Sequence, residues 1–198
     1  MAIRAVFFDL GGVIVRTEFQ SPRQRLADRL NTEYEDLVRL VFESETSRTA
    51  SLGKLTVGEH WSAVARRLGR PVSEADALYD EFFAGDVLDL ELVEFIRSLR
   101  PARHTGLISN AWGDMRSYLA ARKCDDAFDS LTISAEVALL KPDPRIYQLA
   151  LERAAVRPDE AVFVDDTPAN IEACQHLGMI GIVFKDRGQT IDAIKRLI

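Results

Sequence analysis

Three segments of the chain pass directly from an apolar stretch into polar or acidic residues. They read Val6-Phe7-Phe8-Asp9, Gly106-Leu107-Ile108-Ser109-Asn110 and Val162-Phe163-Val164-Asp165-Asp166. A continuous apolar run is typical of a strand that is buried on both faces of a parallel sheet. Ligands of such sheets bind in the crevice beyond the carboxyl ends of the strands. We therefore expect the polar residues that end these segments to meet in one pocket.

Helices and short apolar runs alternate from about residue 89 to the end of the chain. This alternation is typical of a doubly wound α/β fold. With a first strand at residues 5–8, it predicts a mainly parallel, Rossmann-like sheet. Later strands are expected to end near residues 109, 134, 164 and 184, and helices to cover residues 114–122, 144–155, 168–177 and a last stretch from residue 190.

The segment between the first strand and the alternating region has a helical pattern without a convincing strand. Thr32-x-x-Glu35 and Thr56-x-x-Glu59 both fit the capping box that opens a helix. The second box precedes an apolar stripe at helical spacing, which Gly69 ends. This part of the chain therefore reads as a small helical bundle.

The alternating region and the helical segment together predict two domains. We predict an α/β core domain formed by residues 1–15 and 86–198, and an inserted α-helical cap formed by residues 16–85. The insertion leaves the sheet directly after its first strand. We therefore expect the helical segment to lie beside the crevice, where it can act as a lid.

The composition excludes several classes of partner. The net charge of -6, from 25 basic and 31 acidic residues, provides no positive surface for nucleic acid or an anionic membrane. No apolar run approaches the roughly 20 residues that span a bilayer, and the first residues lack the layout of a signal peptide. Cys124 and Cys174 have no metal or redox spacing. We expect a cytoplasmic protein with two reduced thiols, either a monomer or a homodimer.

The acidic residues of the expected pocket indicate a metal. If Asp9, Asp165 and Asp166 converge, their mutual repulsion favours protonation unless a cation binds. Mg²⁺ fits such a site best, because it prefers oxygen ligands in octahedral geometry and retains waters that a phosphate can displace. The three histidines are scattered without ligand spacing, which argues against zinc.

Other polar residues of the pocket point to phosphate chemistry. Lys141 lies between Leu140 and Pro142 in a loop that prolines stiffen, so its ammonium has a fixed direction and can neutralise an anionic substrate. Ser109 and Asn110 would donate hydrogen bonds to phosphate oxygens. Asp9 remains the candidate nucleophile, since an ionised carboxylate can attack phosphorus and form an aspartyl-phosphate.

With these residues in place, the chain resembles the haloacid dehalogenase-like hydrolase superfamily. Each of that family's four motifs is a weak signal alone, but here all four occur in order over nearly the whole chain. The helical segment occupies the position of the family's smaller cap type. The first two motifs are similar to a branch with bacterial sugar-phosphate phosphatases and the phosphatase domain of epoxide hydrolases. The motifs read Asp9-Leu10-Gly11-Gly12-Val13, Ser109-Asn110, Lys141-Pro142 and Asp165-Asp166-Thr167-Pro168-Ala169-Asn170.

The resemblance implies a role for each matching residue. Asp9 would be the nucleophile, while Ser109 and Lys141 would hold the phosphoryl group. Asp165 and Asp166 would bind the ion directly or through water, and any residue at position 11 would bind it through the backbone carbonyl. The implied magnesium ligands are therefore Asp9, Gly11, Asp165 and Asp166.

The first motif departs from the family's pattern at Gly11. Most phosphatases of the superfamily carry a second aspartate there, which protonates the leaving oxygen and then activates water. A general acid/base contributes about 10²- to 10⁴-fold in rate. Activated leaving groups, such as those of acyl, aryl or anomeric sugar phosphates, need less protonation. His60 or Glu59 of the helical segment is an alternative source of the proton.

The sequence thus predicts a magnesium-dependent phosphatase of small phosphorylated metabolites, slowed by Gly11. Two alternatives stay open. One is a catalytically weak or inactive phosphate-binding module, which Gly11 would explain. The other is a 2-haloacid dehalogenase that uses Asp9 on carbon. The doubled Asp165-Asp166 argues against it, because displacement at carbon needs no metal.

Overall fold

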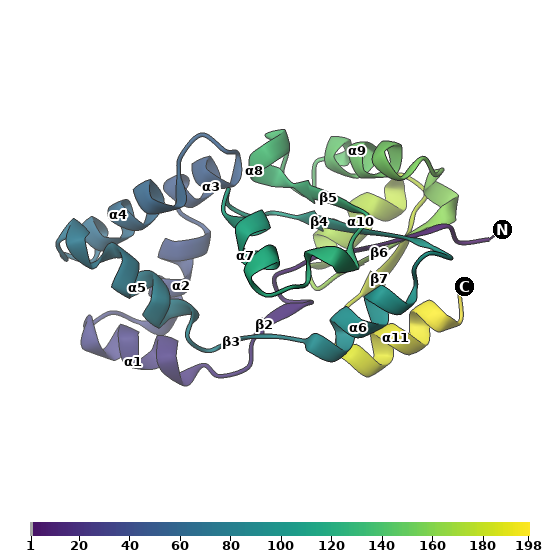
Figure 1. Ribbon diagram of the computed structural model, residues 1–198. Coiled ribbons are helices and arrows are strands. Elements are labelled where there is room, and N and C mark those ends of the chain that lie inside the picture. The colour runs from purple at the N-terminus through teal and green to yellow at the C-terminus, as the bar shows by residue number, and fades with distance from the viewer. Residues whose placement is uncertain (1) are drawn as a thin grey trace.

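The protein is built on a five-stranded parallel sheet with strand order β5-β4-β1-β6-β7 (Figure 1). The structure is a computed structural model that describes residues 2–198. The first strand of the chain lies in the middle of the sheet, between two strands that come much later in the sequence. The strands are β1 (Ala5–Phe8), β4 (His104–Ser109), β5 (Ser130–Ile133), β6 (Ala161–Asp165) and β7 (Ile180–Val183).

Helices cover both faces of the sheet, which explains the uninterrupted apolar runs of the strands. In β1, Val6 and Phe8 pack on one face and Ala5 and Phe7 on the other, and all four are 0% exposed. The predicted α/β class with a mainly parallel sheet is therefore confirmed. The first face is covered by α6 (Leu90–Ser98), α7 (Met115–Ala121) and α11 (Arg187–Lys195), the second by α9 (Pro144–Ala154) and α10 (Pro168–His176), and the short α8 (Ser134–Val137) follows β5.

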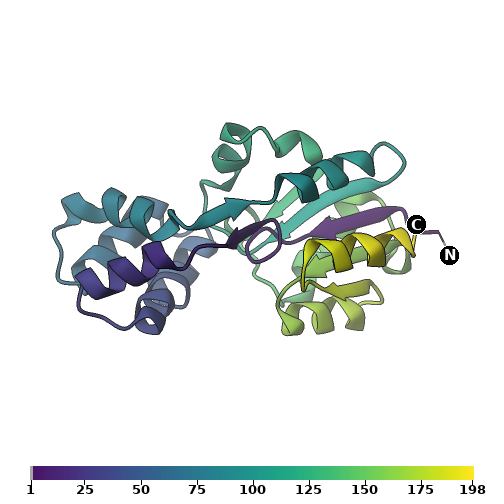
Figure 2. The ribbon, with the colours of Figure 1, turned by 90° about the horizontal axis from the view of Figure 1, so that it is seen from below.

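A bundle of five helices lies at one end of the molecule, and the two chain termini lie at the other (Figure 2). The bundle has an apolar core of its own, with Leu26, Leu37, Trp61, Leu78 and Phe82 at most 2% exposed. Its helices are α1 (Ser21–Arg29), α2 (Tyr34–Phe42), α3 (Glu45–Ser51), α4 (Val57–Arg67) and α5 (Ala75–Phe83). We call α1–α5 the helical block.

A short antiparallel ribbon connects the helical block to the sheet. It pairs β2 (Val15–Thr17) with β3 (Asp86–Leu88), and these are the two chain segments that enter and leave the block. Three-residue strands carry too few side chains for a clear alternating pattern, so the sequence did not predict them. The position of the ribbon supports the proposed division of the chain near residues 15 and 86.

One of the two predicted capping boxes is present and the other is wrong. At α4, Thr56 accepts a hydrogen bond from the amide of Glu59, whose carboxylate accepts one from the amide of Thr56. Thr32 does not cap α2. Its amide donates to the carbonyl of Ala27, after Asn31 with a φ of 52°, so Thr32 belongs to the Schellman motif that ends α1.

Most predicted elements lie within a few residues of their observed bounds. The last helix begins at Arg187 rather than Thr190, because Asp186 caps it by accepting a hydrogen bond from the amide of Gln189. The thiols of Cys124 and Cys174 are buried and unpaired, as expected. Over residues 2–198, we find no helix with the length and apolarity needed to cross a bilayer.

Candidate active site

The carboxyl ends of three neighbouring strands bring the predicted polar residues together. Asp9 follows β1, Ser109 is the last residue of β4, and Asp165 is the last residue of β6. They lie at the base of a cleft of about 1580 Å³ between the sheet and the helical block. Asp9, Ser109, Lys141 and Asp166 line this cleft, whereas Asp165 is 0% exposed beneath it.

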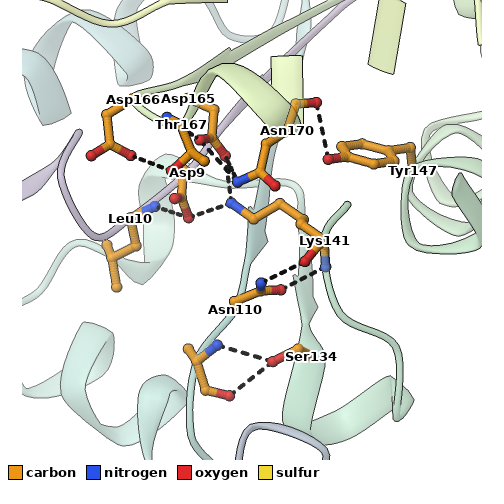
Figure 3. Close-up of polar contacts among 11 residues, drawn as sticks. Asp9, Leu10, Asn110, Ser134, Lys141, Tyr147, Asp165, Asp166, Thr167 and Asn170 are labelled. Atoms are coloured by element: carbon orange, nitrogen blue, oxygen red, sulfur yellow. Dashed lines mark hydrogen bonds and ion pairs between the residues drawn. The ribbon is translucent and has the colours of Figure 1, made fainter. Parts of the chain in front are cut away.

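Lys141 is the cation at the centre of the site (Figure 3). Its Nζ lies 2.8 Å from Oδ1 of Asp9 and 2.6 Å from Oδ2 of Asp165, and its side chain is 1% exposed. A buried ammonium without such partners would be costly. The two carboxylates provide these partners and fix the Nζ atom of Lys141 beside the candidate nucleophile.

Asp165 is fixed by donors from its own loop and helix. Its Oδ1 accepts a hydrogen bond of 2.8 Å from the amide of Thr167. The side-chain amide of Asn170 lies 3.1 Å from both oxygens. These bonds and that of Lys141 satisfy both oxygens of Asp165 and leave it little freedom to move.

The loops after β4 and β5 hold each other in place. The side chain of Asn110 accepts a bond of 2.8 Å from the amide of Lys141 and donates one of 3.0 Å to its carbonyl. Ser134 Oγ accepts from the amide of Ala111 and donates to its carbonyl, at 3.0 and 3.1 Å. Ser134 is a positioning residue that the sequence did not reveal, because nothing near it in sequence marks its partner.

The two oxygens of Asp9 have different surroundings. Oδ1 accepts a hydrogen bond of 2.7 Å from the amide of Leu10 in addition to its contact with Lys141. Within residues 2–198, no protein group donates a hydrogen bond to Oδ2. Burial raises the pKa of Asp9 to about 6, although Lys141 acts in the opposite direction. Oδ2 is therefore the oxygen available to a ligand or to an electrophile.

The predicted acidic group is assembled in the structure. One oxygen each from Asp9, Asp165 and Asp166 lie within 4.8 Å of one another. Burial and the charge of Asp165 raise the pKa of Asp166. The site thus holds more negative charge than Lys141 alone balances, and a divalent cation among these hard oxygen donors would relieve the imbalance.

The two glycines that follow Leu10 have opposite environments. A Cβ atom at Gly11 would have no heavy atom of any residue beyond its two chain neighbours within 4 Å, and Gly11 is exposed to the cleft. A Cβ atom at Gly12 would lie 2.2 Å from Oδ2 of Asp166, and Gly12 has a φ of +77°. Glycine is therefore required at position 12, whereas position 11 has room for a larger side chain.

His60 and Glu59 of the helical block are not placed to replace the acid/base that is missing at position 11. His60 is 0% exposed, and its Nε2 donates to the carbonyl of Val41 while its Nδ1 accepts from Thr46 Oγ1. Glu59 is exposed and bonded to Thr56. Neither residue lines the cleft. The structure thus gives no support to the alternative that His60 or Glu59 replaces the second aspartate, because both serve the packing and capping of α4.

Proteins of known function match this chain over all or most of its length. A rat protein described as bifunctional epoxide hydrolase 2 is 23% identical over 217 residues, which cover all of this chain but only 39% of the relative's length. A D-ribitol-5-phosphate phosphatase of Bacteroides thetaiotaomicron is 26% identical over 185 residues and is covered to 89%, as is this chain.

A solved structure of an enzyme from the same bacterium, in complex with magnesium and inorganic phosphate, superposes with a TM-score of 0.77. The two chains are 19% identical over 96% of this chain and 99% of the other, which shows a shared fold. The family model of haloacid dehalogenase-like hydrolases matches residues 3–178. The chain therefore belongs to the haloacid dehalogenase-like hydrolases.

Proposed function

We propose that this protein is a magnesium-dependent phosphatase of small phosphorylated metabolites that acts through an aspartyl-phosphate on Asp9. The observation that carries the proposal is the arrangement of Asp9, Asp165, Asp166 and Lys141 at the base of one cleft. It combines a nucleophile that has a free oxygen with a cation beside it and an acidic group suited to a metal.

The donor set suits Mg²⁺. The described residues around the site offer carboxylate and backbone oxygens and no histidine or thiolate, which is the preference of a hard cation. Asp9, Asp166 and the carbonyl of Gly11 would hold the ion. Asp165 would contribute through water, because its oxygens already accept protein hydrogen bonds. When bound, the ion would neutralise charge on the phosphate.

The chain's own residues would carry the transfer. Oδ2 of Asp9 attacks phosphorus while the bond from phosphorus to the ester oxygen breaks, and the leaving group departs with that bonding pair. Ser109, Asn110 and Lys141 would bind the phosphoryl oxygens. Water then cleaves the aspartyl-phosphate, which regenerates Asp9 and releases inorganic phosphate.

The leaving group must depart without help from residue 11. No side chain at Gly11 can donate a proton to it, and a general acid/base is worth about 10²- to 10⁴-fold. We therefore propose that turnover is slow, and fastest for aryl, acyl or anomeric phosphates. The relative that acts on D-ribitol 5-phosphate supports phosphorylated carbohydrates as the substrate class.

The helical block would serve as the cap over this cleft. We predict that residues 16–85 form this cap. We also predict a monomer or homodimer in solution and a cytoplasmic location. Phe42 and Arg48 of the block line the cleft opposite the strand ends, which supports the lid role. Bound substrate would then be shielded from bulk water during the transfer.

The proposal is tested with 4-nitrophenyl phosphate. We expect phosphate release with millimolar Mg²⁺, a fall of at least about 10²-fold with excess chelator, and full recovery when Mg²⁺ is restored. Phosphate release that the chelator leaves unchanged would contradict the metal assignment. Chelator-insensitive release of chloride from a 2-chloro acid would instead support a dehalogenase.

Replacing Gly12 by alanine should weaken metal binding. The new Cβ would meet Asp166, and alanine in the left-handed region costs roughly 1–2 kcal/mol. We expect the Mg²⁺ concentration at half-maximal activity to rise about tenfold or more. Gly11→Ala is the matched control, since it adds the same methyl group where no atom beyond the two adjacent residues lies within 4 Å. Equal Mg²⁺ dependence of the two variants would contradict this view of the loop.

A further inference from the structure

A second group of polar residues lines the same cleft and shares no member with the acidic site. Tyr79 comes from α5 of the helical block, and the other members come from the segment of α7. Asp114, Tyr118 and Arg122 are spaced four residues apart, so they form one stripe along that helical segment. All four residues line the cleft. The proposed chemistry at Asp9 uses none of them.

Among residues 2–198, no other residue's side chain pairs with Asp114. Its carboxylate is half-buried, and over residues 2–198 it forms no ion pair and accepts no hydrogen bond from another residue's side chain. Burial is the largest cause of its raised pKa. A partly desolvated carboxylate of this kind is costly unless a ligand or water supplies a donor.

The aromatic rings of Tyr79 and Tyr118 line the same cleft as this carboxylate. The ring of Tyr79 packs against Phe83 and Trp61, with centroid distances of 4.8 and 5.4 Å. The guanidinium of Arg122 lies 3.8 Å from the centre of the Tyr118 ring and forms no ion pair with a described carboxylate. The group therefore combines apolar ring faces with an acceptor, a cationic donor and phenol hydroxyls.

These groups are complementary to a molecule with several hydroxyls. Each hydroxyl both donates and accepts, so it can donate to Asp114 and accept from Arg122 or a phenol. A ligand with only an ammonium group would be repelled by Arg122, and a ligand with only an anionic group would be repelled by Asp114. The carbon-bound hydrogens of a polyol or sugar can pack against the tyrosine rings.

We propose that Asp114, Tyr79, Tyr118 and Arg122 form a subsite for the hydroxyl-bearing leaving group of a polyol or sugar phosphate. The proposal rests on the proposed function, because it assumes that the phosphoryl group binds at Asp9 in the same cleft. Asp114 would select among leaving groups without touching the transferred phosphoryl group. Its removal should therefore change discrimination between substrates more than the rate of transfer.

The test compares two five-carbon phosphates as inhibitors of 4-nitrophenyl phosphate hydrolysis. Ribitol 5-phosphate carries hydroxyls along its chain and n-pentyl phosphate carries none. We expect the wild-type protein to bind the polyol phosphate about tenfold or more tightly, because a hydrogen bond to a charged group is worth roughly that much. Asp114→Asn should reduce the ratio to about threefold or less. Inhibition by inorganic phosphate should be unchanged.

Asp125→Asn is the matched control, since it changes an exposed aspartate outside the cleft. The proposal is overturned if the wild type shows no preference, if Asp114→Asn keeps the full preference, or if phosphoethanolamine binds more tightly than ribitol 5-phosphate. If the wild type does not hydrolyse the aryl phosphate at all, the proposed function fails. The two inhibitors are then compared by calorimetry with Mg²⁺, which still decides whether the subsite prefers hydroxyls.

Discussion

Asp9→Asn is expected to remove turnover of 4-nitrophenyl phosphate, with a fall of about 10⁴-fold or more. The amide of asparagine is a poor nucleophile, and no other described carboxylate has an oxygen free of protein donors beside Lys141. Lys141 would keep its contact with Asp165, so the fold should persist. The measurement is the initial rate of nitrophenol release at saturating Mg²⁺, with circular dichroism as a check on folding.

Asp159→Asn provides the control, because this aspartate lies outside the cleft, its side chain is 40% exposed and it forms an ion pair with Arg157. It should retain the full rate. Acid-quenched wild-type protein incubated with labelled substrate should carry label on Asp9, and the Asp9→Asn variant should carry none. Unchanged turnover in the variant would show that a different group attacks phosphorus.

Gly11→Asp has the largest expected gain. It would introduce the missing acid/base, so kcat/KM for an alkyl phosphate should rise by about 10²- to 10⁴-fold. The rise should be smaller for 4-nitrophenyl phosphate, whose leaving group needs little protonation. The backbone at Gly11 is not in the left-handed region and the space around its Cβ is open, so aspartate fits without strain. Rates on both substrates measure the difference.

Gly11→Asn separates proton transfer from mere occupancy, because asparagine has the same size and cannot act as the acid. It should leave the alkyl phosphate rate near that of the wild type. If neither the wild type nor Gly11→Asp hydrolyses any phosphate ester, the protein is better described as a phosphate-binding module. A gain with Gly11→Asn equal to that of Gly11→Asp would exclude the acid/base explanation.

The sequence was sufficient to predict the fold class and the convergence of the acidic residues. The apolar runs of β1 and β6 lead directly into Asp9 and Asp165, and parallel strands place such ends at the same edge of the sheet. Gly11 was also identifiable from its position two residues after Asp9. These inferences depend on local patterns and on the geometry of a regular sheet.

The contacts between loops could not be predicted from the sequence. Nothing local indicates that Asn110 would bond to the backbone of Lys141, or that His60 would face Val41 inside the helical block. Such partners depend on how separate segments pack, which short-range patterns do not encode. The same holds for the position of Asp114, which no local pattern places in the cleft.

The ribbon of β2 and β3 connects the helical block to the loop that follows Asp9. The carbonyl of Val15 accepts a hydrogen bond from the amide of Gly12, and the carbonyl of Ile14 accepts one from the amide of Asp89. A rotation of the block relative to the sheet would therefore be transmitted through this ribbon to the backbone just after Asp9. A ligand that contacts the block on one side of the cleft would then also shift the backbone beside Asp9 on the other side. The fit of the substrate and the alignment of the nucleophile would therefore depend on each other.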